Sequence, residues 1–187
     1  IQRSIEAGDN FTGVTIMRVD EDLDHGPCLH TESTEIAPDE HTPSLATRLA
    51  AIGAEAMAKT LRDLEVGLLI EQPQDHERAT FAPKIEKSEG AVTFEEAERV
   101  IYDRFRAFDP WPGVFVETGG EAVRLTDMRR TTGDGLPRTI LSMSETVIVA
   151  AGSGAIEILE MQRPGKGRTP AGVVARALGW RSGQRIP

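Results

Sequence analysis

The sequence predicts an α/β unit followed by a small all-β unit, and three patterns support this prediction. Two strand-like segments flank a short acidic loop within the first 36 residues, and a long amphipathic helix follows them. A stretch rich in proline and polar residues then separates this part from the rest of the chain. After it come one helix and five short strand-like segments divided by glycine-rich turns. Such a series of short strands is typical of a small OB-like β-barrel.

The first unit opens on a helix end that Gly8 caps, followed by two strands. Residues 13–19 are β-branched and apolar, and residues 28–36 alternate in polarity. Between them, residues 20–27 place four carboxylates ahead of a Gly-Pro pair. Loops at strand ends are where open α/β sheets bind ligands, and Gly26 would let the backbone approach a planar ligand closely. The alternative is a solvated acidic turn.

The next element is a helix that ends near Val66-Gly67. Thr42 is the expected N-cap, with Pro43 at the first helical position. The apolar residues recur at intervals of three and four, so we expect them to pack against the sheet. They are Leu45, Leu49, Ile52, Ala56, Met57, Leu61 and Leu64. Residues 70–88 have no period and contain Pro73 and Pro83, which predicts an extended linker.

The second unit begins with a helix from Thr93 or Phe94 to Phe108, whose apolar face is Ala97, Val100, Ile101, Phe105 and Phe108. Residues 109–113 end it with two prolines and a glycine, and Trp111 is expected to fill the junction between helix and barrel rather than to stack on a base. The expected strands are 114–117, 122–126, 139–143, 146–150 and 155–162.

Glycine-rich connections complete the second unit. Residues 152–154 read Gly-Ser-Gly and predict a hairpin turn, because no third glycine or helix follows as a phosphate loop requires. A basic loop at residues 163–168 precedes a last helix at 171–178. Its Arg163, Lys166 and Arg168 can follow a phosphate backbone, although an ordinary surface loop is nearly as good an interpretation.

Charge is distributed unevenly along the chain. The net charge is −9, but residues 1–90 hold 8 basic and 18 acidic residues, whereas residues 122–187 hold 10 basic and 5 acidic ones. The last third could therefore face a phosphate backbone. Cys28 is the only cysteine, which excludes an intrachain disulfide and a Cys-rich zinc site and favours a reducing compartment. No apolar run approaches the roughly 18 residues that span a bilayer, so we expect a cytoplasmic protein.

Five motifs resemble, in order and spacing, those of the methionyl-tRNA formyltransferase family. They are residues 13–17, 20–27, 73–75, 79–85 and 106–113. The resemblance implies an incomplete Rossmann-like formyltransferase domain at residues 1–70, a linker at 71–88, and a helix plus an OB-like, tRNA-binding barrel at 89–187. The implied reaction moves a formyl group from 10-formyltetrahydrofolate, as co-substrate and without a metal, to the α-amino group of initiator methionyl-tRNA. A monomer is expected.

The same resemblance assigns roles in the acidic loop. Formyl transfer needs a base for the attacking amine, a donor for the oxyanion and an acid for the leaving nitrogen. The family shares these roles among an Asn, a His and an Asp, and Asp24 matches the aspartate that orients the histidine and stabilises its protonated form. Glu21, Asp22 and Leu23 join Asp24 as the expected folate-binding residues.

Several departures from the family pattern bear on these expectations. The family's Asn-x-His pair lies before the matched stretch, so we expect a truncated chain that is inactive alone. None of His25, His30, His41 and His76 has the context to replace that histidine. Asp22 stands where the family has a glycine, which suggests a left-handed backbone there. His25 replaces a threonine, and Lys166-Gly167 replaces a lysine pair, with Arg168 restoring the charge.

Two other functions stay open from the sequence. One is a different folate-dependent formyltransferase, acting on an amino sugar or linked to a dehydrogenase, because such enzymes use the same loop and a similar barrel. The other is a non-catalytic RNA-binding fragment.

Overall fold

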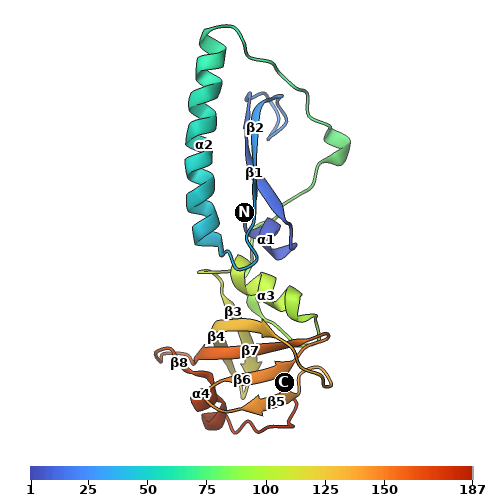
Figure 1. Cartoon of the computed structure of the whole chain (residues 1–187), viewed down its shortest axis with the longest axis vertical. Coiled ribbons are helices and arrows are strands. Elements are labelled where there is room, and N and C mark those ends of the chain that lie inside the picture. Colours follow the sequence, from blue (N-terminus) through green and yellow to red (C-terminus); the bar gives the residue numbers. More distant parts are fainter. Residues whose placement is uncertain (187) are drawn as a thin grey trace.

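The computed structural model describes residues 1–186 of the chain. A β-hairpin and a long helix form one end of the molecule, and an antiparallel sheet forms the other (Figure 1). The hairpin strands are β1 (Phe11–Met17) and β2 (Cys28–Glu35), and helix α2 (Thr42–Glu65) packs along both. Their register pairs Phe11 with Glu35 and Met17 with Cys28, so the loop between them spans residues 18–27. The predicted hairpin is present, but β1 lies two residues earlier than the predicted strand at 13–19.

The first two helices follow their sequence signals closely. Helix α1 (Gln2–Glu6) ends just before Gly8, which takes the left-handed φ of 72° that the predicted cap requires. Helix α2 starts one residue earlier than expected, with His41 rather than Thr42 as its N-cap. The Thr42 hydroxyl instead donates to the carbonyl oxygen of Ala107 at 2.7 Å, a partner far along the chain that sequence cannot reveal.

The connection after α2 is extended and exposed, with two short 3-10 turns. These are η1 (His76–Arg78) and η2 (Lys87–Gly90). Figure 1 shows this segment running outside the hairpin, on the side opposite α2, before it reaches the sheet.

Helix α3 (Glu98–Ala107) begins later than the apolar spacing predicts. Other segments bind the backbone of the residues before it: the Val92 amide donates to the Phe115 carbonyl in a following strand, and the Gly152 amide, in a turn, donates to the Glu96 carbonyl. Phe94 is fully buried in a turn within this stretch, whereas Val100 of the predicted apolar face is exposed. These tertiary contacts therefore override helical spacing here.

The second unit is an open six-stranded antiparallel sheet, in the order β3-β4-β7-β6-β5 with β8 beside β7. Its strands are β3 (Val114–Thr118), β4 (Glu121–Thr131), β5 (Ile140–Met143), β6 (Val147–Ala150), β7 (Ala155–Gln162) and β8 (Thr169–Pro170), and helix α4 (Ala171–Ala177) follows. The five expected strands are confirmed, with β4 longer than predicted and β8 missed. Pairing of Ala150 with Ala155 confirms the hairpin turn at residues 152–154.

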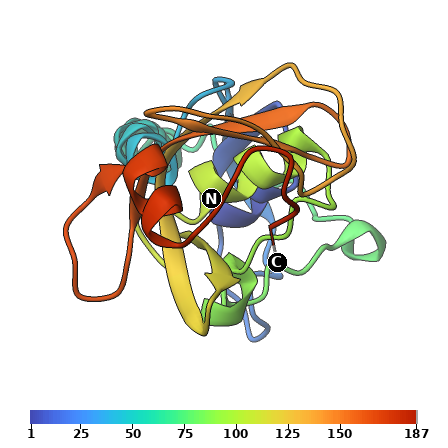
Figure 2. The ribbon, with the colours of Figure 1, turned by 90° about the horizontal axis from the view of Figure 1, so that it is seen from below.

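The sheet curves around α3 without closing. Within residues 1–186 no strand ladder joins β5 to β3, so the strands form a curved open sheet in place of the expected barrel. Seen from below, its strands lie on several sides of α3 (Figure 2). The buried side chains form one connected core that extends from Ile5 in α1 to Ile186.

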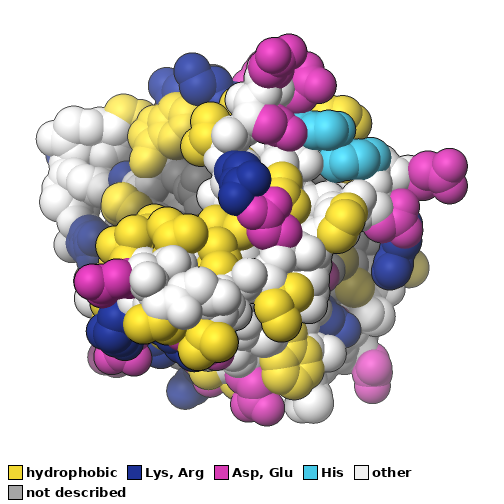
Figure 3. Space-filling view, turned by 90° about the horizontal axis from the view of Figure 1, so that it is seen from above, with side chains coloured by type: hydrophobic (Ala, Val, Ile, Leu, Met, Phe, Trp, Pro, Cys, Tyr) yellow, Lys and Arg dark blue, Asp and Glu magenta, His cyan; other side chains and the backbone are white. Residues whose placement is uncertain are grey.

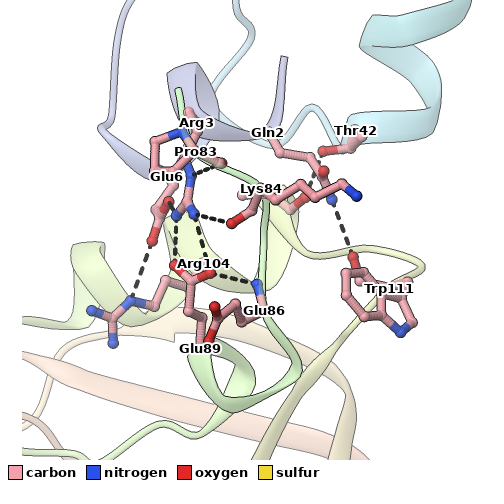
Figure 4. Close-up of polar contacts among 11 residues, drawn as sticks. Gln2, Arg3, Glu6, Thr42, Pro83, Lys84, Glu86, Glu89, Arg104 and Trp111 are labelled. Atoms are coloured by element: carbon pink, nitrogen blue, oxygen red, sulfur yellow. Dashed lines mark hydrogen bonds and ion pairs between the residues drawn. The ribbon is translucent and has the colours of Figure 1, made fainter. Parts of the chain in front are cut away.

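Trp111 does not fill the junction between α3 and the sheet, and that expectation is wrong. Its side chain is 54% exposed, whereas Phe94 and Phe108 are fully buried and already occupy the core. The contact that Trp111 makes with the first unit is through its backbone, because its carbonyl accepts a hydrogen bond from Gln2 Nε2 at 3.1 Å (Figure 4).

Arg3 joins α1 to the end of the linker. Its guanidinium pairs with Glu6 at 2.7 Å and with Glu89 at 2.6 Å, and it donates to the carbonyls of Pro83 and Lys84 (Figure 4). The hydrogen bond to Arg3 holds the pKa of the Glu89 carboxyl below its usual range. The pairing of the Arg3 guanidinium with the Glu89 carboxylate fixes where the linker enters the second unit.

No helix in residues 1–186 combines the length and apolar character that crossing a membrane requires.

Candidate functional site

The acidic loop is closed at its base by the chain itself. The Arg18 amide donates to the Pro27 carbonyl at 3.0 Å, which continues the pairing of β1 with β2 by one step. A Cβ atom on Gly26 would lie 1.8 Å from the Arg18 carbonyl oxygen. Gly26 is therefore required for close approach of the two sides of the loop, and the expectation that it makes room for a ligand is corrected.

The left-handed residue of the loop is Asp24, with a φ of 54°. Asp22, where a left-handed backbone was expected, is not among the positive-φ residues, so that expectation is wrong. The Asp22 amide instead donates to Asp20 Oδ1 at 3.1 Å, so the side chain of Asp20 closes an Asx-type turn. Asp24 tolerates the left-handed region better than most residues, and its carboxylate is exposed at the loop tip.

Two histidines that no sequence motif links lie against each other beside this loop. The rings of His25 and His76 are stacked, with centroids 3.9 Å apart and planes 6° from parallel. Figure 3 shows two adjacent histidine side chains with acidic side chains next to them. His25 Nδ1 lies 2.8 Å from Asp20 Oδ2, and this hydrogen bond raises the pKa of His25 and lowers that of Asp20.

The start of the linker runs alongside the loop. Gln72 exchanges two backbone hydrogen bonds with Cys28, at 2.8 and 2.9 Å, which adds an extended segment next to β2. Gln74 Nε2 donates to the carbonyls of Asp24 at 2.9 Å and Gly26 at 2.6 Å. The motif at residues 73–75 does not predict a role for Gln74, because its hydrogen-bond partners lie about 50 residues away in the chain.

The structure gathers the four predicted folate-binding residues at one place. Glu21, Asp22, Leu23 and Asp24 are consecutive and exposed at the tip of the loop, with Leu23 almost fully accessible. A cleft of about 280 Å³ lies between the two ends of the loop and the linker, where Asp20, His25 and Gln74 line it and the four tip residues do not. The loop tip can thus present carboxylates and backbone groups to a ligand, while the hydrogen bond between Arg18 and Pro27 holds the two ends of the loop together.

The three predicted RNA-binding residues share one connection, between β7 and β8, far from the acidic loop (Figure 1). Lys166 and Arg168 are exposed. Arg163 is partly buried, and its Nη2 pairs with Glu121 Oε1 at 2.8 Å. The basic loop and the acidic loop therefore belong to opposite ends of the molecule and form separate sites.

The described part of the chain shows no cluster of side chains that could bind a metal ion. Residues 1–186 contain no group of three or more His, Cys, Asp or Glu side chains placed to hold one ion. What the acidic loop offers is a free carboxylate on Asp24, held on a backbone that hydrogen bonds from Gln74 restrain. Such a group can orient and stabilise a neighbouring cationic acid or base.

Comparison with known proteins places both ends of the chain in one group of enzymes. The family described as formyl transferase, C-terminal domain, matches residues 84–178, and the family described as formyl transferase matches residues 1–61. The methionyl-tRNA formyltransferase of Methylibium petroleiphilum is 41% identical over 172 residues, which are 91% of this chain and 55% of the relative. That of Solibacter usitatus is 37% identical over 188 residues, all of this chain and 58% of the relative.

Solved structures share the fold at low sequence identity. HypX from Aquifex aeolicus in complex with tetrahydrofolic acid superposes with a TM-score of 0.66 at 21% identity, covering 100% of this chain and 35% of that one. Methionyl-tRNA formyltransferase from Clostridium thermocellum gives a TM-score of 0.53 at 16% identity, covering 73% of this chain and 58% of that one. The chain spans between half and two thirds of the length of the curated relatives it matches.

Proposed function

Because the chain belongs to the formyltransferase family, we propose that it is part of an enzyme that transfers a formyl group from 10-formyltetrahydrofolate to the α-amino group of methionyl-tRNA, in the cytoplasm, at translation initiation. The observation that carries this proposal is the identity of about 40% to methionyl-tRNA formyltransferases along the whole chain. The two family models match this chain in the order formyl transferase, then formyl transferase, C-terminal domain.

In this mechanism the amine nitrogen attacks the formyl carbon, the new C–N bond forms, and the folate nitrogen leaves with a proton. The proposed role of Asp24 is to hold the catalytic histidine in the correct tautomer and to stabilise its protonated form as the proton moves. Glu21, Asp22 and Leu23 would hold the folate at the exposed loop tip. The paired loop base at Arg18 and Pro27 keeps these groups in place.

The 187-residue polypeptide by itself is expected to give no formyl transfer. Its one asparagine, Asn10, is followed by Phe11 and Thr12, so the chain contains no Asn-x-His pair. A chimera would supply this pair by joining the part of the Methylibium relative that precedes the matched stretch to the N-terminus of this chain. The assay measures formyl-methionyl-tRNA made from 10-formyltetrahydrofolate by each protein.

Robust activity of the 187-residue chain would overturn the requirement for the Asn-x-His pair. A folded chimera that leaves methionyl-tRNA unmodified would overturn the proposed function. A nucleotide-linked amino sugar is the comparison substrate, because solved sugar N-formyltransferases share this fold. Formylation of the sugar in place of methionyl-tRNA would assign the chain to that other class.

We further propose the division of the chain into three parts: residues 1–70 within a Rossmann-like domain, a linker at 71–88, and a tRNA-binding unit at 89–187. The curved sheet would serve as the OB-like module of that unit. Lys166 and Arg168, which are exposed, would contact phosphates, and Arg163 would join them on releasing Glu121.

Replacing Arg163, Lys166 and Arg168 by alanine is expected to flatten the salt dependence of tRNA binding. Each lost phosphate contact removes about 0.7 to 0.9 from the slope of log K against log salt concentration. The measurement is a binding titration of the 187-residue chain with initiator tRNA across a salt series. A matched control, Lys59→Ala with Arg62→Ala and Arg78→Ala, makes the same charge change in the other part of the chain and should leave the slope nearly unchanged. Equal slopes for the basic-loop variant and the wild type would remove this loop from the interface.

A further inference from the structure

The loop that carries Asp24 has few hydrogen bonds of its own. Apart from the closing bond between Arg18 and Pro27, residues 18–27 are held among themselves by the side chain of Asp20, which accepts from the Asp22 amide and pairs with His25. Asp24 meanwhile keeps a left-handed φ that L-residues rarely adopt. A backbone in this conformation persists only when surrounding groups restrain it.

The restraint comes from the linker, and Gln74 supplies its central part. One side-chain amide nitrogen has two hydrogens, and Gln74 Nε2 directs them at two carbonyls on either side of His25: those of Asp24 at 2.9 Å and Gly26 at 2.6 Å. The two bonds restrain the peptide plane between Asp24 and His25 and the plane between Gly26 and Pro27. The first of them fixes the carbonyl side of Asp24, and so restrains the backbone from which its side chain extends.

Other contacts hold Gln74 itself in register with the loop. Upstream, Gln72 pairs with Cys28 through backbone bonds, and Glu71 forms an ion pair with Arg18 at the loop base. Downstream, His76 stacks on His25. The segment thus meets the loop at its base and along its side, with the amide of Gln74 between these contacts.

We propose that Gln74 is a positioning residue for formyl transfer, which holds the Asp24 backbone in its left-handed conformation and so aims the Asp24 carboxylate. This proposal rests on the proposed function, because it takes Asp24 as the catalytic carboxylate. The chemistry requires an amide: a leucine offers no donor, and a glutamate of the same shape would turn lone pairs toward the two carbonyls. It also makes the linker a part of the active site rather than a passive connection.

The first test measures loop order in the 187-residue chain, without reference to activity. NMR order parameters of residues 20–26 are expected to be near 0.85 in the wild type and to fall below about 0.6 in Gln74→Leu. Gln72→Leu is the matched control, since Gln72 contacts the loop strand through its backbone. Gln74→Glu keeps the side-chain shape, so the same loss of order there assigns the effect to the donors rather than to volume. Unchanged order in both Gln74 variants overturns the proposal.

The second test measures kcat and KM in the chimera. Both Gln74 variants are expected to lower kcat about tenfold or more with little change in KM for methionyl-tRNA, because a misaimed group slows the chemical step without weakening tRNA binding. A kcat equal to that of Gln72→Leu overturns the positioning role. Failure of the proposed function would show differently: the folded chimera would leave methionyl-tRNA unmodified, while the order parameters would still report whether Gln74 holds the loop.

Discussion

Asp24→Asn in the chimera is expected to lower kcat for formyl transfer by about 10²- to 10⁴-fold. The change removes one negative charge and leaves the shape of the side chain almost unaltered. Without that charge, the histidine that the proposed mechanism pairs with Asp24 loses both its fixed tautomer and the partner of its protonated form. The measurement is the single-turnover rate with saturating methionyl-tRNA and 10-formyltetrahydrofolate.

Folding should be nearly unaffected by this substitution. The Asp24 side chain is exposed, and among residues 1–186 its structural contacts are made by its carbonyl, which accepts from Gln74. Asparagine also tolerates the left-handed φ of 54°. Asp24→Gly suits that φ even better and still removes the carboxylate, so equal losses of kcat in both variants would assign the effect to the charge.

Asp134→Asn is the control for the charge change, because Asp134 lies in the exposed connection between β4 and β5. It should retain wild-type turnover. If Asp24→Asn also retains it, Asp24 is a solvated turn residue and its catalytic role is wrong.

Asp103→Ala is expected to destabilise the chain by about 3–5 kcal/mol, because it removes one partner of a buried ion pair. Asp103 and Arg106 are 6% and 5% exposed, and Asp103 Oδ1 lies 2.5 Å from Arg106 Nη2. The other hydrogen bonds of Arg106 are donations to the carbonyls of Ala37 and Glu40, and its Nε has no hydrogen-bond partner among the described residues. The truncated protein would keep a buried guanidinium without a counter-charge.

Urea unfolding of the 187-residue chain measures this loss. The matched control is Asp63→Ala, which removes the exposed partner of Lys59 on α2, a pair at 3.0 Å, and should cost less than about 1 kcal/mol. Replacing both buried partners, Asp103→Leu with Arg106→Met, should recover much of the stability. Equal unfolding free energies for Asp103→Ala and Asp63→Ala would show that the buried ion pair contributes no more to stability than the pair on α2.

Most secondary-structure elements could be predicted because their signals are local. The Leu45–Leu49–Ile52 spacing identifies α2, alternation identifies β2, and the glycines at 152 and 154 mark the β6–β7 turn. Elements that depend on a distant partner were misjudged. Helix α3 starts late because Val92 bonds to β3 and Glu96 bonds to the β6–β7 turn, and β8 consists of two residues that pair with β7.

In the candidate site, too, some features follow from local sequence and others from contacts between distant segments. Sequence alone determined that an acidic loop containing residues 20–27 separates two strands, since this depends on residue types at fixed spacing. The match of Asp24 to the family's aspartate comes from the same spacing and stays a prediction. Tertiary structure alone decided that Asp24 rather than Asp22 takes the left-handed backbone, that Gly26 serves the approach of Arg18, and that Gln74 holds the loop. These features arise from hydrogen bonds and close contacts between segments far apart in the chain, and a linear pattern does not encode which partners the fold brings together.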